Sequence, residues 1–454
     1  MLRLTWVQPE DLLGHELHQA AQDGRDAASV AARWRAAGGA EAPLRAGAST
    51  VPAPPPLRRL ALDLLDELDA LPDPSAGDEP TELALIRARC PQWPAPPTTP
   101  ARPPGPAALE AAWLGRAVGC LLGKPVEKLP LHGIRALARA AGNWPLGTWF
   151  TARGVPRELL DAHPWNRRSA PTSLAENIDG MPEDDDLNYP LLNLLLLQRR
   201  GRGFSTADVA RLWLDELPAG RTFTAERVAY GNLLAGVEPP DTARARNPFR
   251  EWIGALIRAD MHGWTNPGDP AGAAEQAHRD AVLTHTANGV YAAMFTAAVI
   301  AEAATGASDI HACLRTGLTV VPPGSRLAHA VRHAVRLART TADFDAVVDE
   351  LHATHHGYHW VHAVPNTALI AAALTHADGD FGASVCRAVS GGLDTDSNGA
   401  TAGSVAGLLA GDPAALPDRW TSPLKNRLAT SVADFDGVGF DVLAHLTQRE
   451  SVRP

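Results

Sequence analysis

Residues 391–411 read GGLDTDSNGATAGSVAGLLAG. Two glycines followed by Asp-x-Asp-Ser predict a tight turn that begins a helix, and the same residues are also ordinary helix caps. The helix contains Gly403 and Gly407, although each glycine inside a helix costs about 1 kcal/mol relative to alanine. We therefore expect a buried helix whose backbone approaches another group closely. Its start would present oxygen ligands to a central cavity, from Asp394, Asp396 and Ser397.

Long stretches beyond Ala107 share this Ala- and Leu-rich texture. Apolar residues recur at three- and four-residue spacing, which indicates helices, whereas the alternating pattern of β-strands is almost absent. We therefore predict an all-α domain of about a dozen helices. The clearest segments cover residues 107–122, 185–198, 271–284, 289–304, 326–341, 366–376, 381–390 and 401–409.

The first 106 residues differ in composition and are predicted to form an N-terminal helical extension. Two helices are expected there, from Pro9 to Trp34 and from Leu57 to Leu71. Segment 91–106 is dense in proline, which excludes a helix interior or a central strand and predicts a linker. We expect residues 107–450 to form the main domain, with the extension docked on it as a lid or as an arm that selects the substrate.

The overall charge argues against a nucleic-acid-binding protein. The 454 residues include 41 Lys and Arg against 51 Asp and Glu, a formal net charge of −10, whereas neutralising many phosphates requires a basic surplus. Neither an apolar run of about 18 residues nor the pattern of a signal peptide occurs. We therefore expect a cytoplasmic protein that does not enter a membrane, with its four scattered cysteines reduced and in the core.

A run of four acids, EDDD, occupies positions 183–186 in front of an apolar run. Acids at the start of a helix are favoured by capping and by the helix dipole, so the run can be a simple cap. Four adjacent carboxylates repel one another, however, and such a cluster becomes favourable when it coordinates a hard cation. This motif alone leaves both interpretations open.

Residues 115–127 read GRAVGCLLGKPVE, with glycine at every fourth position from Gly115 to Gly123. This spacing makes one smooth helix face, which is usually used for helix packing. The segment is a poor phosphate loop, because the Walker spacing and a preceding strand are missing.

The three motifs, in this order, resemble those of the ADP-ribosylglycohydrolase family, which includes the dinitrogenase reductase-activating glycohydrolase and the ADP-ribosyl-acceptor hydrolases. Residues 119–127 are similar to the family's glycine-rich helix that ends in GxPxE, 183–186 stand in the place of its TDDT motif, and 391–400 match its GGDTDTNAA motif. Segments 253–258 and 283–289 are similar to its NGAAMR phosphate loop and its LTH segment. The resemblance implies a compact orthogonal bundle of helices from about residue 107 onward.

The resemblance further implies a hydrolase that cleaves the ribose C1 glycosidic bond of an ADP-ribosylated protein or small molecule. It implies two Mg²⁺ ions, or Mn²⁺ in their place, that would anchor the ribose hydroxyls and lower the pKa of a bound water. Glu127 would lie on a mobile loop, gate the metal centre and serve as acid or base. The implied metal ligands are Glu183, Asp184, Asp185, Asp394, Asp396 and Ser397, and the implied catalytic residues are Glu127, Asp184, Asp185 and Asp396.

A substrate-binding set is implied in the middle of the chain. Backbone amides at a glycine together with an arginine can bind phosphate, although an arginine in an Ala-rich helix is more often at the surface. His285 is expected as a neighbour of the site, since a histidine at this place is more often structural than catalytic. The set comprises Gly254, Ala255, Ile257, Arg258 and His285.

Several positions depart from the family pattern and put the substrate in more doubt than the fold. Glu183 and Asp186 replace the two threonines of the metal motif and add negative charge. Cys120 stands where many members have aspartate, and Ile253 stands where asparagine is usual. Two alternatives therefore stay open: a hydrolase of another nucleotide-like N-glycoside, and a non-catalytic protein that binds ADP-ribose or metal on the same scaffold.

A cluster of five histidines spans positions 352–362, namely His352, His355, His356, His359 and His362. Their spacing would place several imidazoles on one helix face, as in a metal site. Gly357 interrupts that helix, and we favour Tyr358 and Trp360 as residues that pack or stack on a ligand.

Overall fold

The computed structural model describes residues 3–43, 47–98 and 101–453. Within these ranges the chain is helical without any β-strand, and the strand-like pairings are three isolated bridges. The predicted all-α class is confirmed. The part from α5 to α22 has 18 α-helices rather than about a dozen, because α7, α8, α12 and α21, of six residues or fewer, are too short to show a helical period.

Most of the helices follow one another closely, and longer connections precede α3, α5, α7, α12 and α22. In the extension they are α1 (Pro9–Gln22), α2 (Ala28–Ala36), α3 (Pro55–Asp69) and α4 (Leu83–Arg89). The remainder comprises α5 (Pro106–Gly123), α6 (Leu131–Ala140), α7 (Arg157–Ala162), α8 (Ala170–Ser173), α9 (Asp185–Arg200), α10 (Thr206–Glu216), α11 (Thr224–Leu234), α12 (Asp260–Trp264), α13 (Pro270–Ala281), α14 (Ala287–Ala303), α15 (Ile310–Leu318), α16 (Arg326–Thr340), α17 (Phe344–Thr354), α18 (Ala363–His376), α19 (Phe381–Ser390), α20 (Thr395–Ala410), α21 (Asp418–Thr421) and α22 (Phe440–Val452).

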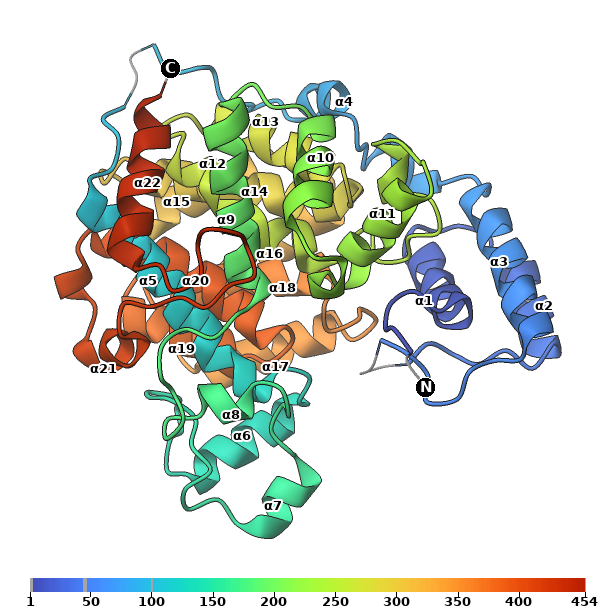
Figure 1. The fold of residues 1–454 in the computed structure, drawn as a ribbon, viewed down its shortest axis with the longest axis horizontal. Coiled ribbons are helices and arrows are strands. Elements are labelled where there is room, and N and C mark those ends of the chain that lie inside the picture. Colours follow the sequence, from blue (N-terminus) through green and yellow to red (C-terminus); the bar gives the residue numbers. More distant parts are fainter. Residues whose placement is uncertain (1–2, 44–46, 99–100, 454) are drawn as a thin grey trace.

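The N-terminal extension docks on the rest of the molecule. Its first predicted helix is split into α1 and α2 at residues 23–27, where Gly24 has a φ of 73°. Figure 1 shows α1, α2 and α3 gathered on the side of the molecule near α11. Residues 99 and 100 of the predicted linker, and 44–46 in the earlier low-complexity stretch, lie outside the described ranges.

The predicted close approach of the glycine-rich helices occurs between α5 and α20, which lie side by side and antiparallel in Figure 1. A Cβ on Gly115 would overlap the carbonyl oxygen of Gly403, and one on Gly119 would overlap that of Gly399. Further along, a Cβ on Gly123 would overlap the backbone of Thr395. Glycine at every fourth position on α5 thus brings its end against the start of α20, where the predicted acids lie.

The core of the molecule is built around α14, whose residues are buried on all sides except Glu302. The extension shares this core, since Trp6, Leu13 and Leu64 belong to the same continuous apolar cluster. All four cysteines are free and buried. No helix in the described ranges combines the length and the apolar character that crossing a membrane requires.

Candidate metal centre and substrate pocket

One cavity of about 420 Å³ collects the acids of two distant motifs. Both α9 and α20 begin at this cavity, so the acidic run before α9 and the turn before α20 meet although they are far apart in the sequence. The predicted residues in its wall are Glu127, Glu183, Asp184, Asp185, Asp394, Asp396 and Ser397.

Asp184 is the N-cap of α9, and its Oδ1 accepts a hydrogen bond of 3.0 Å from the Asp186 amide. Its Oδ2 forms an ion pair with the Lys124 ammonium. Burial alone would raise the pKa of Asp184, but the Lys124 charge together with hydrogen bonds from Lys124, the Asp186 amide and Cys120 lowers it. The capping interpretation of the acidic run therefore holds for this residue, and coordination of a cation stays a prediction.

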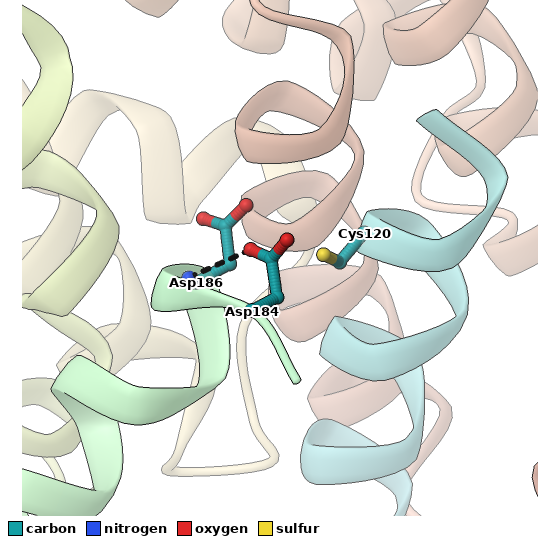
Figure 2. Close-up of side chains that lie close together, drawn as sticks. All are labelled: Cys120, Asp184 and Asp186. Atoms are coloured by element: carbon teal, nitrogen blue, oxygen red, sulfur yellow. Dashed lines mark hydrogen bonds between the residues drawn. The ribbon is translucent and has the colours of Figure 1, made fainter. Parts of the chain in front are cut away.

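Cys120 and Asp186 complete a first group with Asp184, in which one ligand atom from each lies within 4.8 Å of the others. Figure 2 shows the Cys120 side chain on α5 pointing toward the Asp184 carboxylate at the start of α9. Burial, then the charges of Asp184 and Asp186, raise the pKa of the Cys120 thiol well above its usual range. Asp186 is paired with the fully buried Arg116 at 3.3 Å.

A second group consists of Glu127, Asp394 and Asp396, again with ligand atoms within 4.8 Å of one another. Burial and then the neighbouring charges of Glu127 and Asp184 raise the pKa of Asp396 to about 7. Burial and then Asp396 raise the pKa of Asp394 well above its usual range. Such mutual repulsion is relieved by a hard cation, and three carboxylates are the donors that Mg²⁺ or Mn²⁺ prefers, so this group fits a divalent ion.

The turn before α20 is held in place by α18. The Asp394 amide donates to Asn366 Oδ1 at 3.1 Å, and Asn398 Nδ2 donates to the same oxygen at 2.7 Å. Leu393 has a φ of 61°, in the left-handed region, which aims the following residue into the cavity entrance. Asn366 therefore orients the second group without being part of it.

Glu183 lines the cavity, but its carboxylate is bound elsewhere. Its Oε2 pairs with Arg221 at 2.8 Å, and its Oε1 accepts hydrogen bonds from Asn188 and from the Ser431 amide. Asp185 is half-buried in the cavity wall. Burial and the charges of its neighbours raise the pKa of Asp185 well above the usual range.

Arg258 is not available for phosphate. It is fully buried, which overturns the surface alternative as well. Its guanidinium pairs with Glu226 and Asp280, each at 2.9 Å, and also donates to the Thr284 hydroxyl at 2.8 Å. Every side-chain nitrogen of Arg258 donates to the protein, so its position indicates a structural role.

The other residues of the predicted phosphate loop divide between cavity and core. Gly254 and Ile257 line the cavity, whereas Ala255 is buried outside its wall. A Cβ on Gly254 would overlap the carboxylate of Glu226, so this acid covers the loop where a diphosphate was expected. Burial raises the pKa of Glu226, against the opposing effect of Arg258.

His285 is fully buried and outside the cavity wall, in agreement with a structural role. Its Nδ1 lies 2.6 Å from the Thr284 hydroxyl. Burial, and then the Arg258 charge, lower its pKa well below the usual range.

The histidine cluster does not form one helix face. Helix α17 ends at Thr354 and α18 begins at Ala363. His352 Nε2 lies 2.8 Å from the Gly391 carbonyl oxygen, His359 stacks on Trp252, and His362 caps α18. Neither of the two groups of candidate ligands found in the described residues contains a histidine. Trp360, as expected, lines the candidate pocket.

The sequence did not point to several other residues that line the cavity, among them Trp6, Lys124, Arg221 and Glu226. Lys124 lies inside the GxPxE motif. A charged residue between glycine and proline in this motif is a sequence signal that could have identified Lys124 as a residue of the site. Trp6 could not have been found, since nothing near residue 6 indicates a contact with residues 183–186.

Comparison with known proteins agrees with this geometry. A family described as ADP-ribosylglycohydrolase matches residues 107–451. The chain belongs to the ADP-ribosylglycohydrolase family.

A solved structure titled "ADP-ribosylglycohydrolase-related protein complex" is similar to this family member at 22% sequence identity, with a TM-score of 0.50. The similarity covers 76% of this chain and 99% of that chain and concerns the fold. No curated protein matches the chain. ADP-ribosylglycohydrolases are hydrolases of glycosidic bonds and typically depend on metal, in keeping with the acidic groups in the cavity.

Proposed function

We propose that the chain hydrolyses the ribose C1 glycosidic bond of an ADP-ribosylated protein or small molecule at a divalent-metal centre. The observation that carries the proposal is the meeting of Asp184, Asp185, Asp394 and Asp396 with Glu127 in one cavity. The family's action on ADP-ribosylated substrates supports the substrate class.

The metal centre would use Mg²⁺ or Mn²⁺, held by the three carboxylates of Glu127, Asp394 and Asp396, with Asp184, Asp185, Glu183 and Ser397 as the remaining candidates. When bound, such an ion supplies Lewis acidity toward ribose hydroxyls and water. Two ions are implied by the family resemblance.

The contacts of the Glu127 carboxylate support a role in proton transfer. Its Oε2 accepts a hydrogen bond of 2.6 Å from Asn166, and its Oε1 pairs with the exposed Lys128 at 2.9 Å. Cleavage of a glycosidic bond passes through an oxocarbenium-like state that needs an acid for the leaving group and a base for water. We assign Glu127 to one of these roles.

The test is release of ADP-ribose from arginine-, serine- and nucleotide-linked ADP-ribosides, with and without Mg²⁺. We expect metal-dependent release from at least one, and at least about 100-fold slower release by a folded Asp396→Asn variant. Full activity in Asp396→Asn or in Asp184→Asn would refute the site. No release by wild type with metal bound would favour a binding protein or another glycoside.

A second candidate is hydrolysis of an N-glycoside that lacks a diphosphate. The Glu226 carboxylate covers Gly254, and Arg258 is saturated by protein partners, so this end of the cavity is acidic and does not favour phosphate. Nucleosides would then be turned over faster than ADP-ribosides. Replacing Glu226 by Gln should shift the ratio of kcat/KM toward the diphosphate substrates, and an unchanged ratio would rule this candidate out.

A further inference from the structure

We propose that the Lys124 ammonium is a built-in cation that takes the place of one divalent ion, so that the centre binds a single metal ion at Glu127, Asp394 and Asp396. This rests on the proposed metal centre and changes the number of ions from the two that the family resemblance implies.

The first observation is the position of Lys124. It directly follows α5 and begins a short 3₁₀ helix, and it is 7% exposed. Its ammonium forms an ion pair with Asp184 Oδ2 and lies 3.4 Å from the Glu183 carbonyl oxygen. A positive charge is thus held among the oxygen atoms of the acidic run by the protein itself.

The second observation is that the remaining ligand atoms of the first group are also engaged. The other oxygen of Asp184 caps α9. Asp186 is paired with Arg116, which also binds Asp260 at 2.9 Å and is fully buried. Lys124 and Arg116 thus set two protein cations against the carboxylates of Asp184, Asp186 and Asp260, which offsets most of the negative charge around the first group.

The third observation is the identity of the last member of that group. Cys120 offers sulfur, a soft donor, where a hard divalent ion such as Mg²⁺ prefers oxygen. The thiol is fully buried between α5 and the start of α9. The first group therefore lacks the free negative charge of a Mg²⁺ site, and its sulfur leaves only two carboxylates as hard donors, so an ion admitted by the loss of Lys124 would bind weakly.

The second group differs in its donors and in the charges that face Asp394 and Asp396. Its three ligands are carboxylates, and among the described residues no ion pair is recorded for Asp394 or Asp396. Lys128, the one cation paired with Glu127, has an exposed side chain and can move aside. One divalent ion offsets two of the three negative charges of this group, while a second ion beside Lys124 would be repelled by the ammonium.

The experiment counts Mn²⁺ ions bound per full-length chain, by the electron paramagnetic resonance signal of free Mn²⁺ during titration of the metal-free protein. We expect one ion for wild type and two for Lys124→Met, the second at least about tenfold weaker. Two controls should each keep the count at one: Lys128→Met, and the charge-balanced double variant Lys124→Met/Asp184→Asn.

Two ions in wild type would overturn the proposal and leave the proposed hydrolase intact. One ion in Lys124→Met, in a variant whose circular dichroism matches wild type, would show that Lys124 does not exclude the second ion and would also overturn it. If Lys124→Met does not fold, Lys124→Gln, which keeps a hydrogen-bond donor for Asp184, is expected to bind two ions and serves the same purpose. No binding by wild type would overturn the metal centre and this proposal together.

Discussion

At the scale of single residues, the Asp396 carboxylate is buried among like charges, and its pKa is raised to about 7 from an ordinary 3.8. Because this pKa is raised in the folded state, the contribution of Asp396 to stability is fully present below pH 4 and is lost as pH rises through 7. We expect the free energy of unfolding of the metal-free protein to fall by on the order of a few kcal/mol over this pH range because Asp396 loses its proton. Saturating Mg²⁺ should restore the lost stability, because the ion binds the folded state.

The measurement is thermal unfolding from pH 4.5 to 8, with chelator and with Mg²⁺. Asp396→Asn should flatten the pH dependence of the metal-free protein, whereas Asp161→Asn on the exposed face of α7 should not. Parallel curves for wild type and Asp396→Asn would contradict the expectation.

His15 carries an opposite pH dependence. It is buried among the rings of Trp6, Phe249 and Trp252, its Nε2 has no hydrogen-bond partner, and burial lowers its pKa to about 3. Below pH 6.5 this histidine is protonated in the unfolded chain but stays neutral in the folded protein. The free energy of unfolding therefore falls as pH decreases from 6.5 toward 3. At pH 5 the loss is about 2 kcal/mol.

Replacing His15 by Phe should remove this loss, so the difference in unfolding free energy between variant and wild type should grow from pH 8 to pH 5. Urea unfolding at both pH values measures it. The exposed His329→Gln serves as control, and a difference that stays constant with pH would disprove the assignment to His15.

At the scale of elements, the contact between α5 and α20 positions the site. Because a Cβ on Gly119 would overlap the Gly399 carbonyl oxygen, we expect Gly119→Ala to cost at least about 3 kcal/mol through overpacking. The start of α20 would shift with it, so Mg²⁺ affinity should fall as well. Thermal unfolding and a metal titration test both effects.

The matched control is Gly231→Ala, in the middle of α11, where a Cβ would meet open space. Removing this glycine should stabilise the protein by about 0.5–1 kcal/mol. If both alanine variants changed stability alike, the cost at Gly119 would reflect helix propensity rather than the contact between the helices.

At the scale of the whole molecule, buried ion pairs join the extension to the rest. Arg250, 5% exposed, pairs with Glu16 at 2.6 Å and with Asp23 at 2.7 Å, both from the extension. Arg250→Ala leaves the Glu16 carboxylate buried without its ion-pair partner, whereas Asp23 keeps Arg25 and Arg326, and the change should cost about 3–5 kcal/mol. Trypsin should then cleave after Arg87 or Arg89 sooner.

Arg246→Ala is the matched control, since its pair with Asp66 bridges the same two parts at the surface. Such exposed pairs contribute about 0–1 kcal/mol, so both stability and cleavage should stay near wild type. Equal cleavage rates in the two variants would mean that the buried pairs do not hold the extension.

The extension also contributes to the pocket. Trp6 lines the cavity with Phe223 and Trp360, and the Thr5 carbonyl and hydroxyl oxygens each accept a 3.0 Å hydrogen bond from Arg227 of α11. We propose that this arm is a fixed wall that selects the substrate. Trp6→Ala should raise KM for ribosides with a planar aromatic ring by about tenfold, as expected for lost stacking.

Steady-state kinetics of Trp6→Ala and Trp6→Phe test this, and the phenylalanine should recover most of the affinity. Trp93→Ala changes a tryptophan outside the cavity wall and should leave KM unaltered. An unchanged KM in Trp6→Ala would exclude the arm from substrate recognition.

The amino-acid sequence alone determined the helical class, most of the long helices and the acids that meet in the cavity. Helix periodicity and glycine spacing are local properties, and they specify α5, α9, α19 and the start of α20 within a few residues. The resemblance of three ordered motifs then indicated which carboxylates would meet. The ligand roles and the boundary near residue 106 stay predictions.

Tertiary structure alone decided which charges neutralise one another. Arg258 pairs with Glu226 and Asp280, and Lys124 pairs with Asp184. These ion pairs form because packing brings together side chains that are distant in sequence. Long-range packing likewise decides that the histidine cluster is not one continuous helix and that Trp6 lies at the cavity. Helix periodicity depends on residues a few positions apart, whereas the pairing of buried charges depends on long-range contacts, which a single sequence does not display.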